Sequence, residues 1–203
     1  MVFLDEYEEA NDCHICRASR WKLNDTCADD NANCSTIPAN VLQYFPLAPR
    51  LQRLFMYEEM ATAMRWRATD RPNNRNLRHP TDAKAWKDFD DLYPEFAQDP
   101  RNVRLGLASD GFNPFRTMSI SHSTWSVVLG NYNLSPLIFM KPEYFFLSII
   151  IPGHKSSGKD IDIYLQLIIR EFKQLWEVGV ETYNPPKKYF LCGWHYYGQL
   201  VTF

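Results

Sequence analysis

The sequence predicts a mixed α/β fold, and two features of its second half carry that prediction. Three apolar segments, each followed by turn residues, have the pattern of β-strands, and one amphipathic helix follows them. The 203 residues are 45% hydrophobic and 15% aromatic, so the chain has enough apolar side chains for a packed core. Charged residues make up 23%, which is typical of globular proteins and argues against disorder throughout.

The first strand is predicted from Val103, where apolar residues alternate with Arg, Gly and Ala. It should end at Asp110 and Gly111, because Asp-Gly is a turn signal. Residues 126–129 predict the second strand, since they precede Gly-Asn. Residues 144–151, rich in Ile and Phe, predict a third strand that is buried.

A helix is predicted from Ile161 to Leu175, where apolar residues recur at steps of four, three, four and three along one face. Gly179 should mark its end. An antiparallel β-β-β-α order suits the opening of a ribonuclease H-like domain, although many α+β folds begin in the same way. We assign this domain to residues 99–203.

Residues 41–98 are predicted to form a helical region. After Pro46 and Pro49, apolar residues recur mostly at spacings of three to five. Thr81 is the expected N-cap of a short helix that continues to about Leu92.

Residues 1–40 form a small, acidic, cysteine-containing segment ahead of that region. They carry eight acids against three bases and four of the five cysteines of the chain. Residues 24–33 are almost wholly polar and are interpreted as a loop or linker.

Composition limits the partners and the location of the protein. The net charge is −2, so any nucleic-acid binding must come from a local basic patch. The longest apolar run, residues 144–151, is far shorter than the ~20 residues that span a bilayer, so no membrane partner is expected. The N-terminus has no basic signal-peptide segment, and an odd number of cysteines fits reduced thiols. We expect an intracellular protein, nuclear or cytoplasmic, that is not secreted.

An arginine-dense segment is the candidate basic patch. Residues 65–80 hold five arginines against one acid, with enough Pro and Asn to disfavour regular structure. This composition fits a contact with the phosphate backbone of DNA and fits a solvated loop equally well. The candidate DNA-binding residues are Arg65, Arg67, Arg71, Arg75 and Arg78.

Cys13 and Cys16 form a single C-x-x-C pattern and are candidate zinc ligands. Zinc needs four ligands, and Cys27 and Cys34 are the only other nearby candidates. The simpler interpretation is a pair of ordinary reduced thiols.

Two further patterns have simple explanations. Residues 153–160 imitate a phosphate-binding loop, but Asp160 stands where a hydroxyl should contact Mg²⁺, so a strand-to-helix turn is favoured. The acids Asp88, Asp90 and Asp91 lie on the short predicted helix and are interpreted as its solvated face.

Asp110 differs from the other acids because a strand should hold it rigidly at the edge of a sheet. That is a good position for a metal-binding carboxylate, although a simple Asp-Gly turn would also account for these two residues.

One long segment and several shorter ones closely resemble the plant CACTA-type (En/Spm-like) transposase family. The long segment is RNVRLGLASDGFNPF at residues 101–115, and the resemblance runs from about residue 4 to about residue 186. The shorter landmarks follow the family's order: CHICRASRWK at 13–22, YFPLAPRLQRLF at 44–55, LRHPTDAKAWK at 77–87 and YNLSP at 132–136.

The resemblance implies a ribonuclease H-like nuclease of the DDE/D class. In that class three carboxylates hold two Mg²⁺ ions for DNA strand cleavage and transfer. Asp110 matches the first catalytic Asp, and DNA at the transposon ends would be the partner.

The end of the chain departs from the family pattern. A strand with the second Asp should follow Asn184, but no Asp or Glu occurs after Glu181. We therefore expect an incomplete ribonuclease H-like domain in a truncated transposase that is inactive alone. The alternative is a non-catalytic DNA- or protein-binding module derived from a transposase. A third outcome is loss of function through aggregation, because missing strands would leave residues 145–151 poorly covered.

Overall fold

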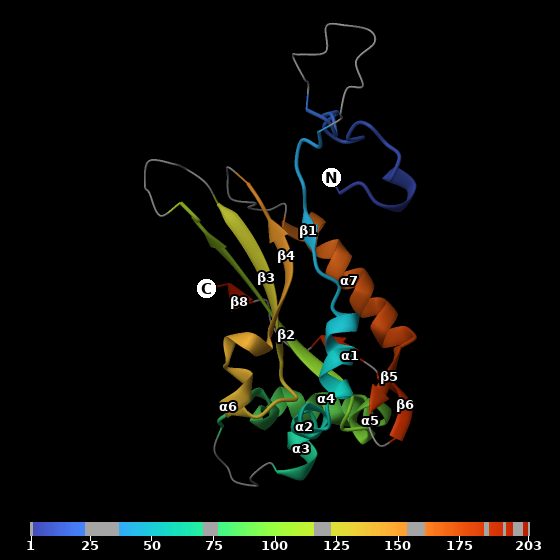
Figure 1. The fold of residues 1–203 in the computed structure, drawn as a ribbon, viewed down its shortest axis with the longest axis vertical. Helices are drawn as coiled ribbons and strands as arrows, with labels where there is room; N and C mark the ends of the chain where they lie inside the picture. Colours follow the sequence, from blue (N-terminus) through green and yellow to red (C-terminus); the bar gives the residue numbers. More distant parts are fainter. Residues whose placement is uncertain are drawn as a thin grey trace, which may run out of the picture.

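A central sheet organises the protein, as the computed structural model in Figure 1 shows. Its middle is an antiparallel meander of β2 (Val103–Phe112), β3 (Thr124–Asn131) and β4 (Phe145–Ile151). The three predicted strands and their order are thus confirmed. The structure describes residues 2–22, 37–70, 77–115, 123–153, 161–184, 187–192, 194–196 and 201–202.

Short strands extend the meander on both sides. β1 (Gln43–Tyr44) pairs antiparallel with β4, while β7 (Trp194–Tyr196) and β8 (Val201–Thr202) pair in parallel with β2. A separate hairpin consists of β5 (Val180–Asn184) and β6 (Lys187–Cys192). Antiparallel and parallel pairing in one sheet, together with several helices, confirm the mixed α/β class.

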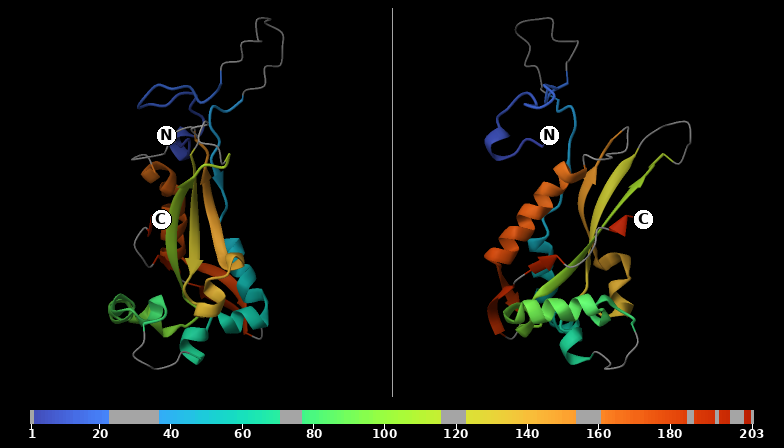
Figure 2. Two further views of the ribbon diagram at one scale, coloured as in Figure 1. Left: turned by 90° about the vertical axis from the view of Figure 1, so that its left-hand side faces the viewer. Right: turned by 180° about the vertical axis from the view of Figure 1, so that it is seen from behind.

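The helices gather on one face of the sheet and at the end where β2 begins (Figure 2). α7 follows β4 and runs along one face, and its predicted position is confirmed. Gly179, just beyond α7, has a φ of 76°, which glycine adopts without strain.

None of the described helices is long and apolar enough to span a bilayer. The helices are α1 (Ala48–Met56), α2 (Glu58–Ala63), α3 (Trp66–Thr69), α4 (Lys84–Leu92), α5 (Pro94–Gln98), α6 (Pro136–Phe139) and α7 (Ile161–Glu177), with 3-10 turns at Asp5–Tyr7, Pro80–Asp82 and Pro142–Tyr144.

β2 is longer than the sequence predicts, because Gly111 does not end it. Asp110 pairs with Ser126 of β3, and Gly111 pairs with Trp125. A Cβ atom at Gly111 would lie 2.6 Å from Cε2 of Trp125, so glycine is needed for close packing rather than for a turn. Asp110 therefore lies inside a strand and not at its end.

The region before β2 also differs from its prediction. Thr81 is not the N-cap of α4: it lies in a 3-10 turn capped by His79, whose Nδ1 accepts a hydrogen bond from the Thr81 N–H at 3.3 Å. α4 begins only at Lys84, although it ends at Leu92 as predicted. Upstream, the first helix begins at Ala48, because the preceding segment pairs with β4 as β1.

β4 is well covered, which contradicts the expectation of a poorly covered third strand. Phe146, Ile149 and Ile151 are at most 9% exposed. Their side chains share a core with buried residues of α1 and α7, including Leu51, Phe55, Leu165, Ile168 and Leu175.

A carboxylate of α7 holds the start of α1. Oε1 of Glu171 accepts hydrogen bonds from the N–H groups of Leu47 and Ala48 at 2.8 and 3.0 Å, and Oε2 accepts one from the Tyr44 hydroxyl at 2.6 Å. α1 has no side-chain cap of its own, so Glu171 supplies the anion that a helix N-terminus favours. Burial and the bond to Glu171 raise the pKa of Tyr44, so its phenol stays protonated and donates.

Arg50 joins the same segment to the sheet. Its guanidinium and Nε donate to the carbonyl oxygens of Phe45, Pro46 and Leu147 at 2.7, 2.9 and 2.6 Å. Together, Glu171 and Arg50 connect β1, α1, β4 and α7. The YFPLAPR landmark at residues 44–50 is thus part of the scaffold.

Replacing Glu171 should test this connection. We expect Glu171→Ala to lower the free energy of unfolding by about 2 kcal/mol, because two helix N–H groups and one hydroxyl lose their acceptor. Glu177→Ala, an exposed site on the same helix, should stay within about 0.5 kcal/mol of the parent. Urea denaturation followed by circular dichroism measures both; equal midpoints for the two variants would contradict the role of Glu171.

Candidate functional site

Asp110 lies in β2, an interior strand of the sheet, with its side chain exposed. Its Oδ1 accepts a hydrogen bond from the N–H of Gly111 at 2.8 Å. Its neighbour Ser109 is buried and pairs with Thr202 of β8. Asp110 therefore follows directly after the part of β2 that pairs in parallel with β8. A strand paired on both sides is a rigid base for a functional carboxylate.

Asp110 could provide one ligand for a magnesium ion, but the described residues do not form a complete magnesium site. Carboxylate oxygens are the ligands that Mg²⁺ prefers. Within the described residues, no three His, Cys, Asp or Glu side chains converge as a metal site would require. β8, which pairs beside Ser109, consists of Val201 and Thr202 and brings no carboxylate next to Asp110.

The five candidate arginines have different environments. Arg78 is exposed, while Arg65 is half-buried and its Nε donates to the Ala61 carbonyl at 3.1 Å. Arg67 is 13% exposed and forms an ion pair with Asp90 at 3.4 Å, so its guanidinium is engaged inside the protein. Arg71 and Arg75 lie outside the described residues.

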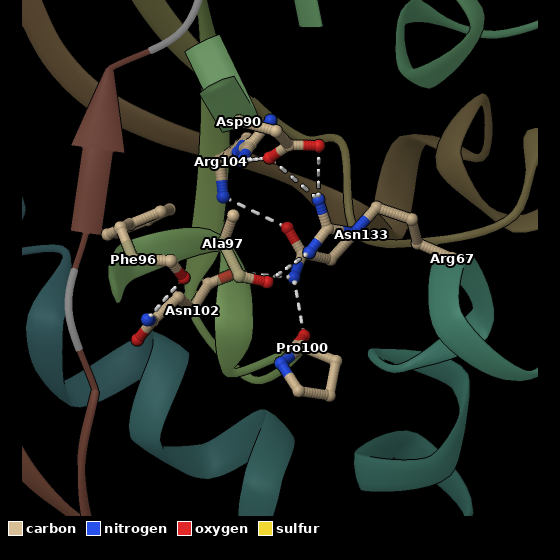
Figure 3. Close-up of polar contacts among 8 residues, drawn as sticks. All are labelled: Arg67, Asp90, Phe96, Ala97, Pro100, Asn102, Arg104 and Asn133. Atoms are coloured by element: carbon tan, nitrogen blue, oxygen red, sulfur yellow. Dashed lines mark hydrogen bonds and ion pairs between the residues drawn. The ribbon is translucent and has the colours of Figure 1, made fainter. Parts of the chain in front are cut away.

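Arg104, the second residue of β2, is the centre of the best-defined polar cluster (Figure 3). Its side chain is 1% exposed, and Nη2 forms an ion pair with Asp90 of α4. Its guanidinium carbon lies 4.0 Å from the ring centroid of Trp86 and 4.5 Å from that of Phe89. The cation is thus neutralised by a carboxylate and stacked on aromatic faces.

The prediction for Asp90 was wrong. The sequence places it among the acids of a solvated face, yet its carboxylate is only 32% exposed and binds both Arg104 and Arg67. Asp88 and Asp91, in contrast, are exposed as predicted. A run of three acids does not show which one meets a partner from a distant strand.

Asn133 fixes the backbone at the same end of β2. Its Oδ1 accepts a hydrogen bond from the Arg104 N–H at 2.9 Å, and its Nδ2 donates to the Asn102 carbonyl at 2.8 Å and the Pro100 carbonyl at 3.4 Å. Asn133 belongs to the YNLSP landmark at 132–136, and Asn102 and Arg104 belong to the landmark at 101–115. The two landmarks therefore bind each other.

The Arg104 cluster and Asp110 occupy separate parts of β2. The two positions are six residues apart, which is about 20 Å along a strand. The helices α3, α4 and α5 surround the beginning of β2, and its far end extends away from them (Figure 1). The structure does not bring Arg67 and Asp110 into one site.

Cys13 and Cys16 lie in the N-terminal segment, ahead of β1. Cys13 is 6% exposed, Cys16 is exposed, and neither forms a disulfide. Cys27 and Cys34 lie outside the described residues.

Removing the carboxylate of Asp90 should destabilise the protein strongly. We expect Asp90→Asn to lower the free energy of unfolding by about 2 kcal/mol or more, because it leaves the buried Arg104 guanidinium without its counter-charge. Asp88→Asn is the matched control: it removes an exposed acid from the same helix and should change this free energy by less than about 0.5 kcal/mol. Thermal and urea unfolding report the difference, and a loss no larger than that of Asp88→Asn would refute the pairing.

Comparison with known proteins identifies the family. The sequence profile of transposase family tnp2 matches residues 74–191, which is more than half of the chain. The matched region contains both the Arg104 cluster and Asp110. No significant match was found among curated proteins or among solved structures. The match over β2, β3, β4 and α7 agrees with the resemblance seen in the landmarks, and the chain belongs to transposase family tnp2, the CACTA/En-Spm transposase family.

Proposed function

We propose that this chain is a part of a DNA transposase that carries out metal-dependent strand cleavage and transfer, and that Asp110 is one of the carboxylates of its metal site. The observation that carries the proposal is the position of Asp110: it is an exposed acid on β2, an interior strand of the sheet within the family-matched region. A transposase acts on DNA, and divalent ions held by carboxylates activate the attacking and leaving oxygens of such reactions.

The sheet supports a ribonuclease H-like fold for this domain. A three-stranded meander is followed by α7, and the chain then returns to pair in parallel with the first strand of the meander. A crossover helix is the usual way in which a chain reaches a parallel neighbour. On this interpretation β2 is the first strand of the domain, and Asp110 is its first metal-binding acid.

We further propose that the chain alone does not cleave DNA. Among the described residues no three His, Cys, Asp or Glu side chains converge on one point, and one carboxylate cannot hold two divalent ions. Residues 182–203 contain no Asp or Glu. The protein would then bind DNA without cutting it, as a non-catalytic DNA-binding module would; a protein-binding module is the other form of that alternative.

A cleavage assay tests this proposal directly. We expect the purified chain to show no Mg²⁺- or Mn²⁺-dependent cleavage of labelled terminal-repeat DNA, and Asp110→Ala to give the same result. Circular dichroism should show that both proteins are folded. Robust cleavage that disappears in Asp110→Ala would overturn the claim of inactivity while supporting the role of Asp110.

DNA contact is proposed for four of the five arginines of the 65–80 segment. Arg67 is excluded from this set because its guanidinium pairs with Asp90 and its Nη2 donates to the Ala97 carbonyl at 3.5 Å. The proposed contacts are Arg65, Arg71, Arg75 and Arg78. Each phosphate contact that is lost should reduce the salt dependence of binding by about one unit in a plot of log K against log salt.

Neutralising those four arginines should weaken DNA binding. We expect the fourfold Arg→Gln variant to bind a labelled duplex more weakly, with a salt slope smaller by about three to four. The control removes four exposed cations elsewhere, by Lys22→Gln, Arg53→Gln, Lys141→Gln and Lys173→Gln. Fluorescence anisotropy over a salt series measures both slopes. The same slope in the two variants would remove the segment from the DNA interface.

A further inference from the structure

The two N-terminal cysteines lie in one tight loop. The N–H of Arg17 donates to the Cys13 carbonyl at 2.7 Å, and the N–H of Cys13 donates to the Ala18 carbonyl at 2.9 Å. Arg17 has a φ of 56°, a left-handed conformation that non-glycine residues rarely adopt. An isolated bridge between Asp12 and Ser19 closes the loop. The backbone therefore turns back on itself directly after Cys16.

This loop directs backbone donors at a sulfur atom. The backbone of Cys16 and Ile15 forms hydrogen bonds with the Cys13 sulfur. Cys13 is also buried, whereas the residues next to it on both sides are exposed.

We propose that Cys13 and Cys16 are two thiolate ligands of a zinc ion. A C-x-x-C loop brings two sulfurs to one metal, and zinc is the common metal for such pairs in proteins. The left-handed residue after the second cysteine and the N–H groups around the first sulfur shape the loop before the metal binds. This proposal concerns the N-terminal segment and does not depend on Asp110 or on DNA binding.

Zinc would supply stability that this segment otherwise lacks. Among the described side chains of residues 2–22, only Cys13 is buried. A segment with so small a core gains its folding free energy from a structural metal. Among the described residues no third His, Cys, Asp or Glu joins this pair to form a metal-binding group. The ring of the nearby His14 stacks on Tyr7, with centroids 4.7 Å apart.

Metal analysis of the full, reduced chain tests the proposal. We expect about one zinc ion per chain, and a Co²⁺-substituted protein with sulfur-to-cobalt charge-transfer bands whose intensity gives the number of thiolates. Cys13→Ser and Cys16→Ser should each weaken binding at least about tenfold in a chelator competition. Cys192→Ser, which changes the cysteine in β6, is the control and should retain the metal.

Substitutions at Arg17 test the loop geometry without touching a ligand. Arg17→Gly should retain zinc or bind it more tightly, because glycine adopts a positive φ without strain. Arg17→Val should bind it more weakly, since a β-branched residue resists that conformation. The proposal is overturned if the reduced chain takes up no zinc, if Cys13→Ser binds it as the parent does, or if Cys13 and Cys16 form a disulfide that persists with zinc present.

Discussion

The buried charge of Arg104 is the constraint on which the rest of the structure depends. A guanidinium that is 1% exposed must be neutralised, and Asp90 is the carboxylate that does so. Asp90 lies on α4, so α4 must dock where β2 begins, with Trp86 and Phe89 against the cation. One ion pair thereby determines how the helical region before the sheet is placed against β2.

This arrangement separates β2 into a supporting end and an exposed end. At the first, Asn133 and Arg104 hold the backbone, and at the second Asp110 projects from a strand that is paired on both sides. A functional carboxylate needs such a rigid base, because metal coordination tolerates only small displacements. The cluster around Arg104 lies about 20 Å from Asp110 along the strand and supports the proposed chemistry by holding the backbone of β2 in place.

Most landmarks shared with the CACTA family have structural roles in this chain. The segment at residues 44–50 bonds to Glu171 and Leu147, the segment at 77–87 supplies the His79 cap and Trp86, and the segment at 132–136 supplies Asn133. Among the described landmark residues, Asp110, Arg78 and the cysteine loop are the candidates for chemistry that the scaffold does not use. For this reason the proposals on metal and DNA rest on Asp110, four arginines of the 65–80 segment and the Cys13–Cys16 pair.

Local pattern determined the meander, α7 and the family, because alternation and helical periodicity depend on residues a few positions apart. The same pattern could identify Asp110 as a candidate but placed it at a strand end, since the need for glycine at position 111 comes from Trp125 across the sheet. Only the tertiary structure decided that Asp90 and Arg67 face inward and that Glu171 caps α1. These partners lie 14 to 124 positions apart, and no local periodicity carries information about contacts over such distances.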